Sequence, residues 1–352
     1  MIDILKDILP YISGLYTLPW ILIGFIVTIL LSRFIDAKKI DKIMKKIGLS
    51  LLFFFVPFLL FRIFLKVDFG AEQIAFVIVT IIMLIFMYKL AYVFAKYKAE
   101  KYGLKKSNKQ LFIKTVLTNQ GRSSAFIGGA LLASPWKVEA AIFIALVGIA
   151  LFAVIPYILS YIHKKETHKT DEHIKSLPWY LKLYPWYLIS FVIAAVILHG
   201  PMHININAES SEWIIFKFLT ATTIPGALYY VGASIHPQDL KISEMKKLFT
   251  LKQKNKTKDH WPLVRNIFLI TVILTPLIIG TIFGILLLLG IITSAWFAVI
   301  VINSFLPITS TNIFLVPYGI DKKSTALSIT WTTIICVPIV VFLIYIFTIL
   351  FT

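Results

Sequence analysis

A short polar run, Thr118 to Ser124, lies inside a hydrophobic segment that covers residues 111–132. It reads Thr-Asn-Gln-Gly-Arg-Ser-Ser and contains no large apolar side chain. An arginine at the centre of a membrane helix costs about 2.5–3.5 kcal/mol on insertion scales, so Arg122 requires a compensating interaction. Two roles would supply it. The guanidinium either binds a carboxylate of a substrate through two hydrogen bonds, or caps carbonyl groups left unpaired where helices break.

A second polar run, residues 303–312, interrupts another hydrophobic segment and contains Pro307. Proline removes a helix hydrogen bond, which predicts a second broken helix. Irregular backbone at membrane depth is tolerated only where it is buried in protein or lines a wet cavity, so we expect the two breaks to cross near the midplane and bind substrate. The predicted substrate-binding residues are Asn119, Gln120, Gly121, Arg122, Ser123, Ser124, Asn303, Ser304, Pro307, Thr309, Ser310 and Asn312.

Some polar residues have an alternative structural role. Asn119 and Asn303 either bind substrate or replace backbone hydrogen bonds lost at the breaks. Thr222 and Thr223 either line the cavity or bond to their own helix backbone. Pro57 and Pro225 are interpreted as residues that shape their helices.

Membrane helices are predicted to position these runs. Of the 352 residues, 59% are hydrophobic, against roughly 45–50% apolar residues in a soluble domain, and long apolar stretches recur throughout. Residues 1–12 alternate apolar and charged positions as a short interfacial helix does. The fold class is all-α integral membrane, with ten predicted spans at residues 16–33, 49–65, 72–95, 110–132, 138–162, 179–199, 212–235, 263–289, 294–317 and 324–351.

The charge pattern indicates orientation in the membrane. The chain has 35 Lys+Arg against 17 Asp+Glu, a net charge of +18. Because the basic residues concentrate in alternate loops, we interpret them as a topology signal and not as a nucleic-acid surface. The opposite loops contain only Lys6, Lys66 and Lys137. The positive-inside rule therefore predicts a multi-pass protein of the cell (plasma) membrane with both termini outside.

Prolines indicate an internal repeat. Pro57 and Pro225 lie in the predicted second and seventh spans, and the fifth and tenth spans each contain another proline. Two units of five spans insert with opposite orientation because five is odd, as in many secondary transporters. The predicted domains are a first repeat at 1–162, a cytosolic linker at 163–178 and an inverted second repeat at 179–352. The repeat pairs Gly121 with Asn303, so the two polar runs become the crossed breaks of the fourth and ninth spans.

Two motifs resemble signatures of a known family. Residues 55–61, Phe-Val-Pro-Phe-Leu-Leu-Phe, resemble the second-span signature of the auxin efflux carrier family, within the bile/arsenite/riboflavin transporter superfamily. Residues 224–235 resemble its seventh-span signature, a proline followed by a leucine-rich turn and a glycine.

Further likeness covers the rest of the chain. Asn119-Gln120-Gly121 resembles the start of the family motif Asn-x-Gly-x-x-Gly-x-Pro, and Pro307 with residues 318–321 and 332–338 resembles the last two spans. The chain departs from the motif at Ser124 and Phe126, and Arg122 occupies a usually apolar position. The resemblance implies ten helices in scaffold and transport domains, crossed broken helices, and export or exchange of small organic anions.

Acidic residues are absent from the interior of the predicted spans, since Glu72, Glu139 and Glu212 lie at outer ends. No carboxylate is therefore available for a proton relay. We expect efflux or uniport of a small carboxylate-type anion by alternating access. The alternatives are a sodium- or proton-coupled symporter of the bile acid type, and a transporter-like sensor.

Enzyme chemistry has no candidate residues at suitable spacing. The single cysteine, Cys336, excludes intrachain disulfides and thiolate zinc clusters, and the histidines within residues 163–173 and 199–203 are interpreted as loop residues. We therefore predict no enzyme, no metal site and no cofactor. The predicted partners are a small-molecule anion and the lipid bilayer, without nucleic acid, and a homodimer is left open.

Overall fold

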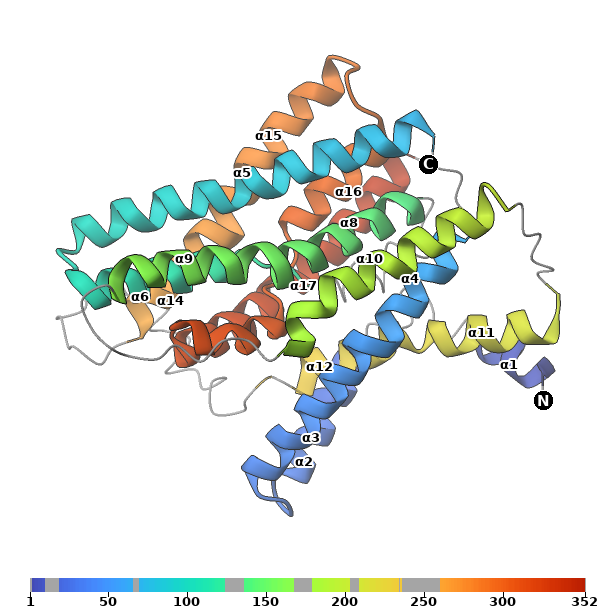
Figure 1. Ribbon diagram of the computed structural model, residues 1–352, viewed down its shortest axis with the longest axis horizontal. Helices are drawn as coiled ribbons and strands as arrows, with labels where there is room; N and C mark the ends of the chain where they lie inside the picture. The colour runs from blue at the N-terminus through green and yellow to red at the C-terminus, as the bar shows by residue number, and fades with distance from the viewer. Residues whose placement is uncertain are drawn as a thin grey trace.

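The computed structural model describes residues 2–9, 19–65, 70–123, 136–167, 179–202, 209–233, 235 and 260–351. Ser124, Phe126 and the second half of the predicted fourth span lie outside these ranges. Within them the chain is almost entirely helical (Figure 1). The helices are α1 (Ile2–Ile8), α2 (Trp20–Leu31), α3 (Ala37–Ser50), α4 (Val56–Phe64), α5 (Ala71–Lys101), α6 (Lys106–Thr118), α8 (Lys137–Ile149), α9 (Ile155–Thr167), α10 (Trp179–His199), α11 (Ser211–Ala221), α12 (Thr223–Ala233), α14 (Trp261–Phe268), α15 (Thr275–Leu288), α16 (Ser294–Ser304), the 3₁₀-helix η7 (Ser310–Tyr318) and α17 (Lys322–Phe351).

Six stretches among the described residues are long and apolar enough to cross a membrane, which makes the chain an all-helical, multi-pass membrane protein. Each coincides with one of the ten predicted spans. Two further predicted spans, 16–33 and 294–317, contain the shorter apolar helices α2 and α16. The six stretches are Lys42–Phe64, Ala71–Lys101, Lys182–His199, Ser211–Ala233, Trp261–Leu288 and Lys322–Phe351.

The two remaining predicted spans differ from each other. Over the predicted span 138–162, α8 and α9 run continuously and reach Thr167, inside the predicted linker. Over the predicted span 110–132, α6 ends at Thr118, where the polar run begins. The ten-span inverted repeat stays a prediction.

Three helix pairs are joined by a π-helical turn that ends two residues before a proline. In the third turn, the N–H of Thr275 donates to the carbonyl of Ile270, five residues earlier. The next carbonyl, that of Thr271, would need the N–H of residue 276, and Pro276 has none. Each such turn therefore leaves one carbonyl without a backbone partner. The turns are Leu51–Phe55 between α3 and α4, Ala150–Val154 between α8 and α9, and Leu269–Leu274 between α14 and α15.

The predicted helix-shaping prolines lie at such irregular positions. Pro57 follows the first π-helical turn, in the first turn of α4. Pro225 lies in the first turn of α12, just after the interruption at Thr222 that separates α11 from α12.

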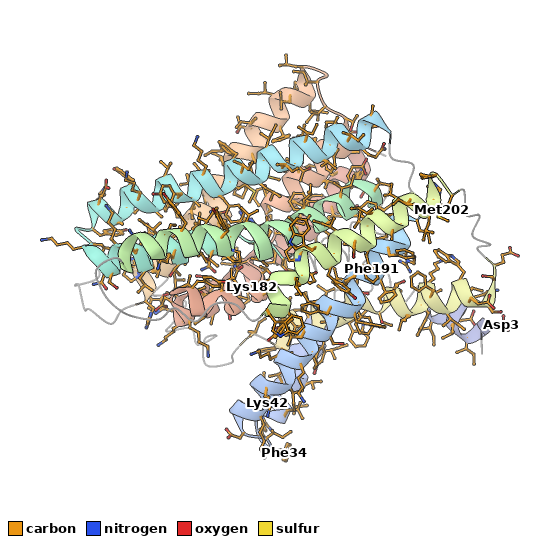
Figure 2. All side chains as sticks on the ribbon, viewed as in Figure 1. Asp3, Phe34, Lys42, Lys182, Phe191 and Met202 are labelled. Atoms are coloured by element: carbon orange, nitrogen blue, oxygen red, sulfur yellow. The ribbon has the colours of Figure 1, made fainter. Side chains whose placement is uncertain are left out.

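The helices pack in two groups (Figure 1). The first, the scaffold group, contains α2, α3, α4, α10, α11 and α12. In it α2 packs along α12 and α10 along α4, where Phe191 of α10 lies 5.1 Å from Phe58 between ring centroids (Figure 2). The second, the crossing group, contains α5, α6, α8, α9, α14, α15, α16, η7 and α17. The groups meet where α4 and α10 pack against α8.

Two glycines permit the close packing of α2 and α12. A Cβ atom on Gly24 would overlap the carbonyl oxygen of Tyr229, and a Cβ on Gly232 would overlap that of Ile21. Small residues allow membrane helices to approach until their backbones touch. The two contacts, 24 with 229 and 21 with 232, run in opposite directions and so place α2 antiparallel to α12.

We predict that Gly24→Ala and Gly232→Ala each lower the stability of the purified protein, because the added methyl meets backbone that cannot rotate away. Overpacking of this kind costs about 1–3 kcal/mol. Thermal unfolding in detergent measures the loss. Gly280→Ala in α15 is the matched control, since a Cβ there meets nothing within 4 Å. Equal melting temperatures for all three variants would contradict the close contact.

Candidate functional site

The two polar runs lie against each other where α6 and α16 end. The N–H of Ser123 donates to the carbonyl of Pro307 at 2.9 Å, and the N–H of Thr309 donates to the carbonyl of Gly121 at 3.0 Å. Together the bonds form a short antiparallel bridge between extended segments. Each break thus supplies hydrogen-bond partners that the other lost when its helix ended.

The structure brings most of the predicted site residues together and buries them. Arg122 and Ser123 are buried on one segment, and Thr309 on the other. Ser310 begins η7, and Ser124 lies outside the described part of the chain. Fully or almost fully buried with them are Asn119, Gln120, Gly121, Asn303, Ser304, Pro307 and Asn312.

The amide groups of Asn119 and Asn303 make similar hydrogen bonds at the ends of α6 and α16. Asn119 Nδ2 donates to the carbonyl of Thr115 at 2.8 Å and to Thr325 Oγ1 at 3.1 Å. Asn303 Nδ2 donates to the carbonyl of Val299 at 2.6 Å. Each amide bonds the carbonyl four residues earlier, although the Thr115 carbonyl also accepts the N–H of Asn119 itself, at 3.1 Å. The two roles considered for these residues both stay open. Their Oδ1 atoms are buried without a hydrogen-bond partner among the described residues.

Gly121 permits the crossing sterically. A Cβ at this position would lie 2.8 Å from Oδ1 of Asn312, closer than real Cβ atoms approach. Asn312 is fully buried, and both of its amide atoms lack a partner within the described ranges. Any larger residue at 121 would displace this side chain.

Arg122 is 2% exposed and bonds only neutral acceptors. Nη2 donates to the carbonyl of Thr271 at 2.9 Å and to Oε1 of Gln120 at 3.4 Å. Nη1 donates to the carbonyl of Leu306 at 3.3 Å. Nε has no partner among the described residues. These contacts are those of the capping role, one of the two that the sequence left open.

The Thr271 carbonyl needs a hydrogen-bond donor from outside its own helix. It is the carbonyl that Pro276 leaves unpaired in the π-helical turn between α14 and α15. An unsatisfied carbonyl in a membrane interior costs several kcal/mol, and Arg122 removes that cost. The Leu306 carbonyl lies in the break after α16, so the guanidinium links three helices at their irregular points.

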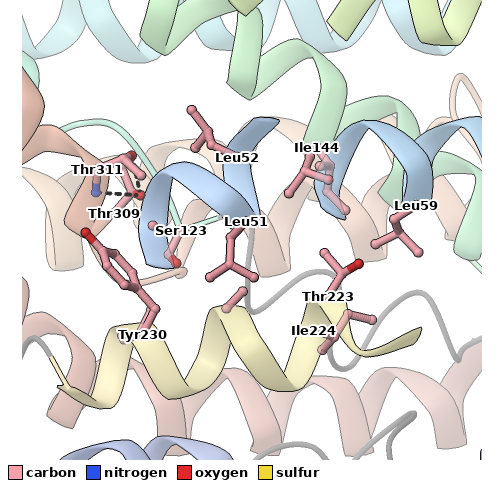
Figure 3. Close-up of a pocket in the computed structure, with 14 residues that line it drawn as sticks. Leu51, Leu52, Leu59, Ser123, Ile144, Thr223, Ile224, Tyr230, Thr309 and Thr311 are labelled. Atoms are coloured by element: carbon pink, nitrogen blue, oxygen red, sulfur yellow. Dashed lines mark hydrogen bonds between the residues drawn. The ribbon is translucent and has the colours of Figure 1, made fainter. Parts of the chain in front are cut away.

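A cavity with about 660 Å³ of empty space, including its open part, lies between the two helix groups beside the crossing (Figure 3). Most of its wall is aliphatic, with Leu, Ile and Val side chains from the α3–α4 and α12 helices. Its polar atoms are hydroxyls and adjoining backbone, and among the described residues neither Arg122 nor any other charged side chain lines it. The hydroxyl residues are Ser123, Thr223, Tyr230, Thr309 and Thr311.

Sequence patterns identified part of this lining. Ser123 and Thr309 were predicted site residues, and Thr223 both lines the cavity and donates to the carbonyls of Thr220 at 2.6 Å and Phe55 at 3.3 Å. Tyr230 was not predicted. Gly48 is the sequence feature that could have pointed to Tyr230, because a glycine there leaves room for the tyrosine ring.

These features define a multi-pass helical membrane protein in which the extended segments that follow α6 and α16 meet beside a cavity between two helix groups. Compared with known proteins, the chain matches no family model and no curated protein. The likeness to the auxin efflux carrier family therefore depends on the sequence motifs alone.

We predict that Arg122→Met destabilises the fold because it leaves the Thr271 and Leu306 carbonyls unpaired, at about 1–3 kcal/mol each. Arg122→Lys should recover part of the loss, since one ammonium cannot span acceptors on several elements. Thermal unfolding of the purified variants measures both effects.

A double-mutant cycle tests the link to proline. Pro276→Ala restores an N–H that can bond the Thr271 carbonyl, so Arg122→Met should cost about 1 kcal/mol less in that background. Pro338→Ala, inside α17, is the control background. An equal cost of Arg122→Met in both backgrounds would contradict the assignment of Thr271 as the critical acceptor.

Proposed function

We propose that the protein is a secondary transporter that moves a small organic anion, of the carboxylate type, across the membrane by alternating access. The observation that carries this proposal is the cavity between the scaffold and crossing groups, which has hydroxyls where the segments after α6 and α16 form a bridge. Secondary transporters commonly bind substrates at discontinuous helices within the membrane.

The anionic character of the substrate follows from an uncompensated charge. Arg122 is buried beside Ser123, and its hydrogen bonds go to three neutral oxygens, without a carboxylate among the described residues. The 3₁₀-helix η7 also begins at the cavity, and the first turn of a helix favours negative charge. We infer that a carboxylate binds near Ser123 and Thr309, with its apolar part against the aliphatic wall.

Transport would use the boundary between the groups. The cavity is lined by residues of both, so a movement of the crossing group against the scaffold group changes the shape of the site. An anion leaving a negative-inside cell gains about 2.3 kcal/mol per charge per 100 mV, which is sufficient to drive efflux or uniport.

A coupled symporter is the second candidate function. The unpaired Oδ1 atoms of Asn119 and Asn303 are buried oxygens near the crossing that could accept bonds from a proton carrier or meet a sodium ion. Flux that depends on a sodium or pH gradient would favour this candidate. A sensor would bind ligand without moving it.

We predict that a carboxylate ligand raises the melting temperature of the purified protein in a screen of carboxylates, amino acids and bile-acid-like anions. A ligand at a hundred times its Kd stabilises the folded state by about 2.7 kcal/mol. Flux of the same ligand is then measured in liposomes.

Two substitutions locate the site. Ser123→Ala and Thr309→Val should weaken ligand binding about fivefold to tenfold each, the value of one lost hydrogen bond. Thr281→Val is the control, since Thr281 bonds only its own helix, at Leu277. Binding that is unaffected by both cavity variants would exclude this cavity as the substrate site, and binding without flux would indicate a sensor.

A further inference from the structure

Tyr230 lies at one end of the cavity. In Figure 3 it extends from α12 toward Thr309 and Thr311, whereas Thr223 and Leu59 lie toward the other end. Tyr230 is half-buried, and its ring is the only aromatic side chain among the described residues that line the cavity. The ring therefore forms part of the cavity wall at the end beside Thr309 and Thr311.

Gly48 provides the place that the ring occupies. A Cβ on Gly48 would lie 2.9 Å from Cε2 and Cζ of Tyr230 and 3.0 Å from its hydroxyl oxygen. The ring thus lies directly on the backbone of α3, in a space that exists because residue 48 has no side chain. On the same face of α12, a Cβ on Gly226 would lie 2.9 Å from Cδ2 of Leu51, so the helices are close along this whole contact.

We propose that Tyr230 is the gate at this end of the cavity, with Gly48 as the seat of its closed position. The ring is placed between Gly48 of the scaffold group and Thr309 and Thr311 of the crossing group. Movement of one group against the other therefore changes the space available to the ring. Tyrosine covers a large area with only two side-chain torsions, so the closed position costs little conformational entropy.

The side of the membrane follows from the charges on α3. Lys39, Lys42, Lys45 and Lys46 precede Gly48, and Lys42 lies toward the free end of the α2–α3 pair (Figure 2). Basic helix ends lie on the cytosolic side under the positive-inside rule. Tyr230 is thus the gate on the cytosolic side. It controls access from the cytosol to the site of the proposed transporter.

The test measures access and does not require transport. Cys336, the single cysteine, is 1% exposed, and replacing it with alanine gives a background without thiols. Ala227→Cys then places one thiol on the cavity wall. The rate of its modification by a charged, membrane-impermeant thiol reagent is measured from each side in oriented vesicles.

We predict that Tyr230→Ala raises the modification rate from the cytosolic side about tenfold or more, because a closed conformation opens only ~0.1–10% of the time. Gly48→Ala should raise it as well, since the added methyl occupies the seat of the ring. Tyr230→Phe should leave it unchanged, because the ring performs the closure. Tyr157→Ala is the control, at a tyrosine that is 75% exposed on α9.

The outcomes separate the gate from the proposed function. An unchanged rate in both Tyr230→Ala and Gly48→Ala overturns the gate, even if the wild-type protein transports an anion. A raised rate in a protein that moves none of the screened anions supports the gate and counts against the transporter. A rise from the opposite side only would overturn the cytosolic assignment.

Discussion

The burial of one arginine among neutral carbonyls is the interaction on which the centre of this molecule depends. Arg122 bonds Thr271 and Leu306, and both carbonyls lie at interruptions of helices. The first is unpaired because Pro276 lacks an N–H, and the second because α16 has ended. In water such groups would be solvated, but in a membrane interior they need protein donors. Placing Arg122 in the membrane costs free energy, but its hydrogen bonds lower the cost of the unpaired carbonyls where the neighbouring helices are interrupted.

The crossing in turn requires small residues where backbones approach. Gly121 leaves space for Asn312, while Gly24 and Gly232 let α2 and α12 touch in the scaffold group. Because each group is tightly joined internally and the two meet mainly through α4, α10 and α8, the free volume lies between them. Side chains thus fill the space within each group, and the space that they leave unfilled is the cavity between the groups.

The sequence predicted the parts of this arrangement that depend on local chemistry. Polar runs and prolines in apolar segments predicted two breaks, since a membrane helix tolerates neither without partners. It could not identify the acceptor of Arg122, because Thr271 is 149 residues away and its carbonyl is free only through a π-helical turn. Tyr230 was missed because an aromatic residue on a membrane helix is ordinary until Gly48 is seen opposite it. The second half of the predicted fourth span lies outside the described residues, so its crossing partner stays a prediction.

The two roles considered for Arg122 are compatible, because hydrogen bonding and charge are separate requirements. Neutral oxygens satisfy most of its donors, yet they leave a net positive charge inside the membrane. At an effective dielectric constant of ~20, two unit charges 8 Å apart still interact by about 2 kcal/mol. An anion near Ser123 would gain energy of this order without touching the guanidinium. Direct contact would instead withdraw Arg122 from the carbonyls it caps. In the proposed transporter, an arginine behind the few hydroxyls of a mostly aliphatic cavity would thus favour an anion there while it still caps both carbonyls.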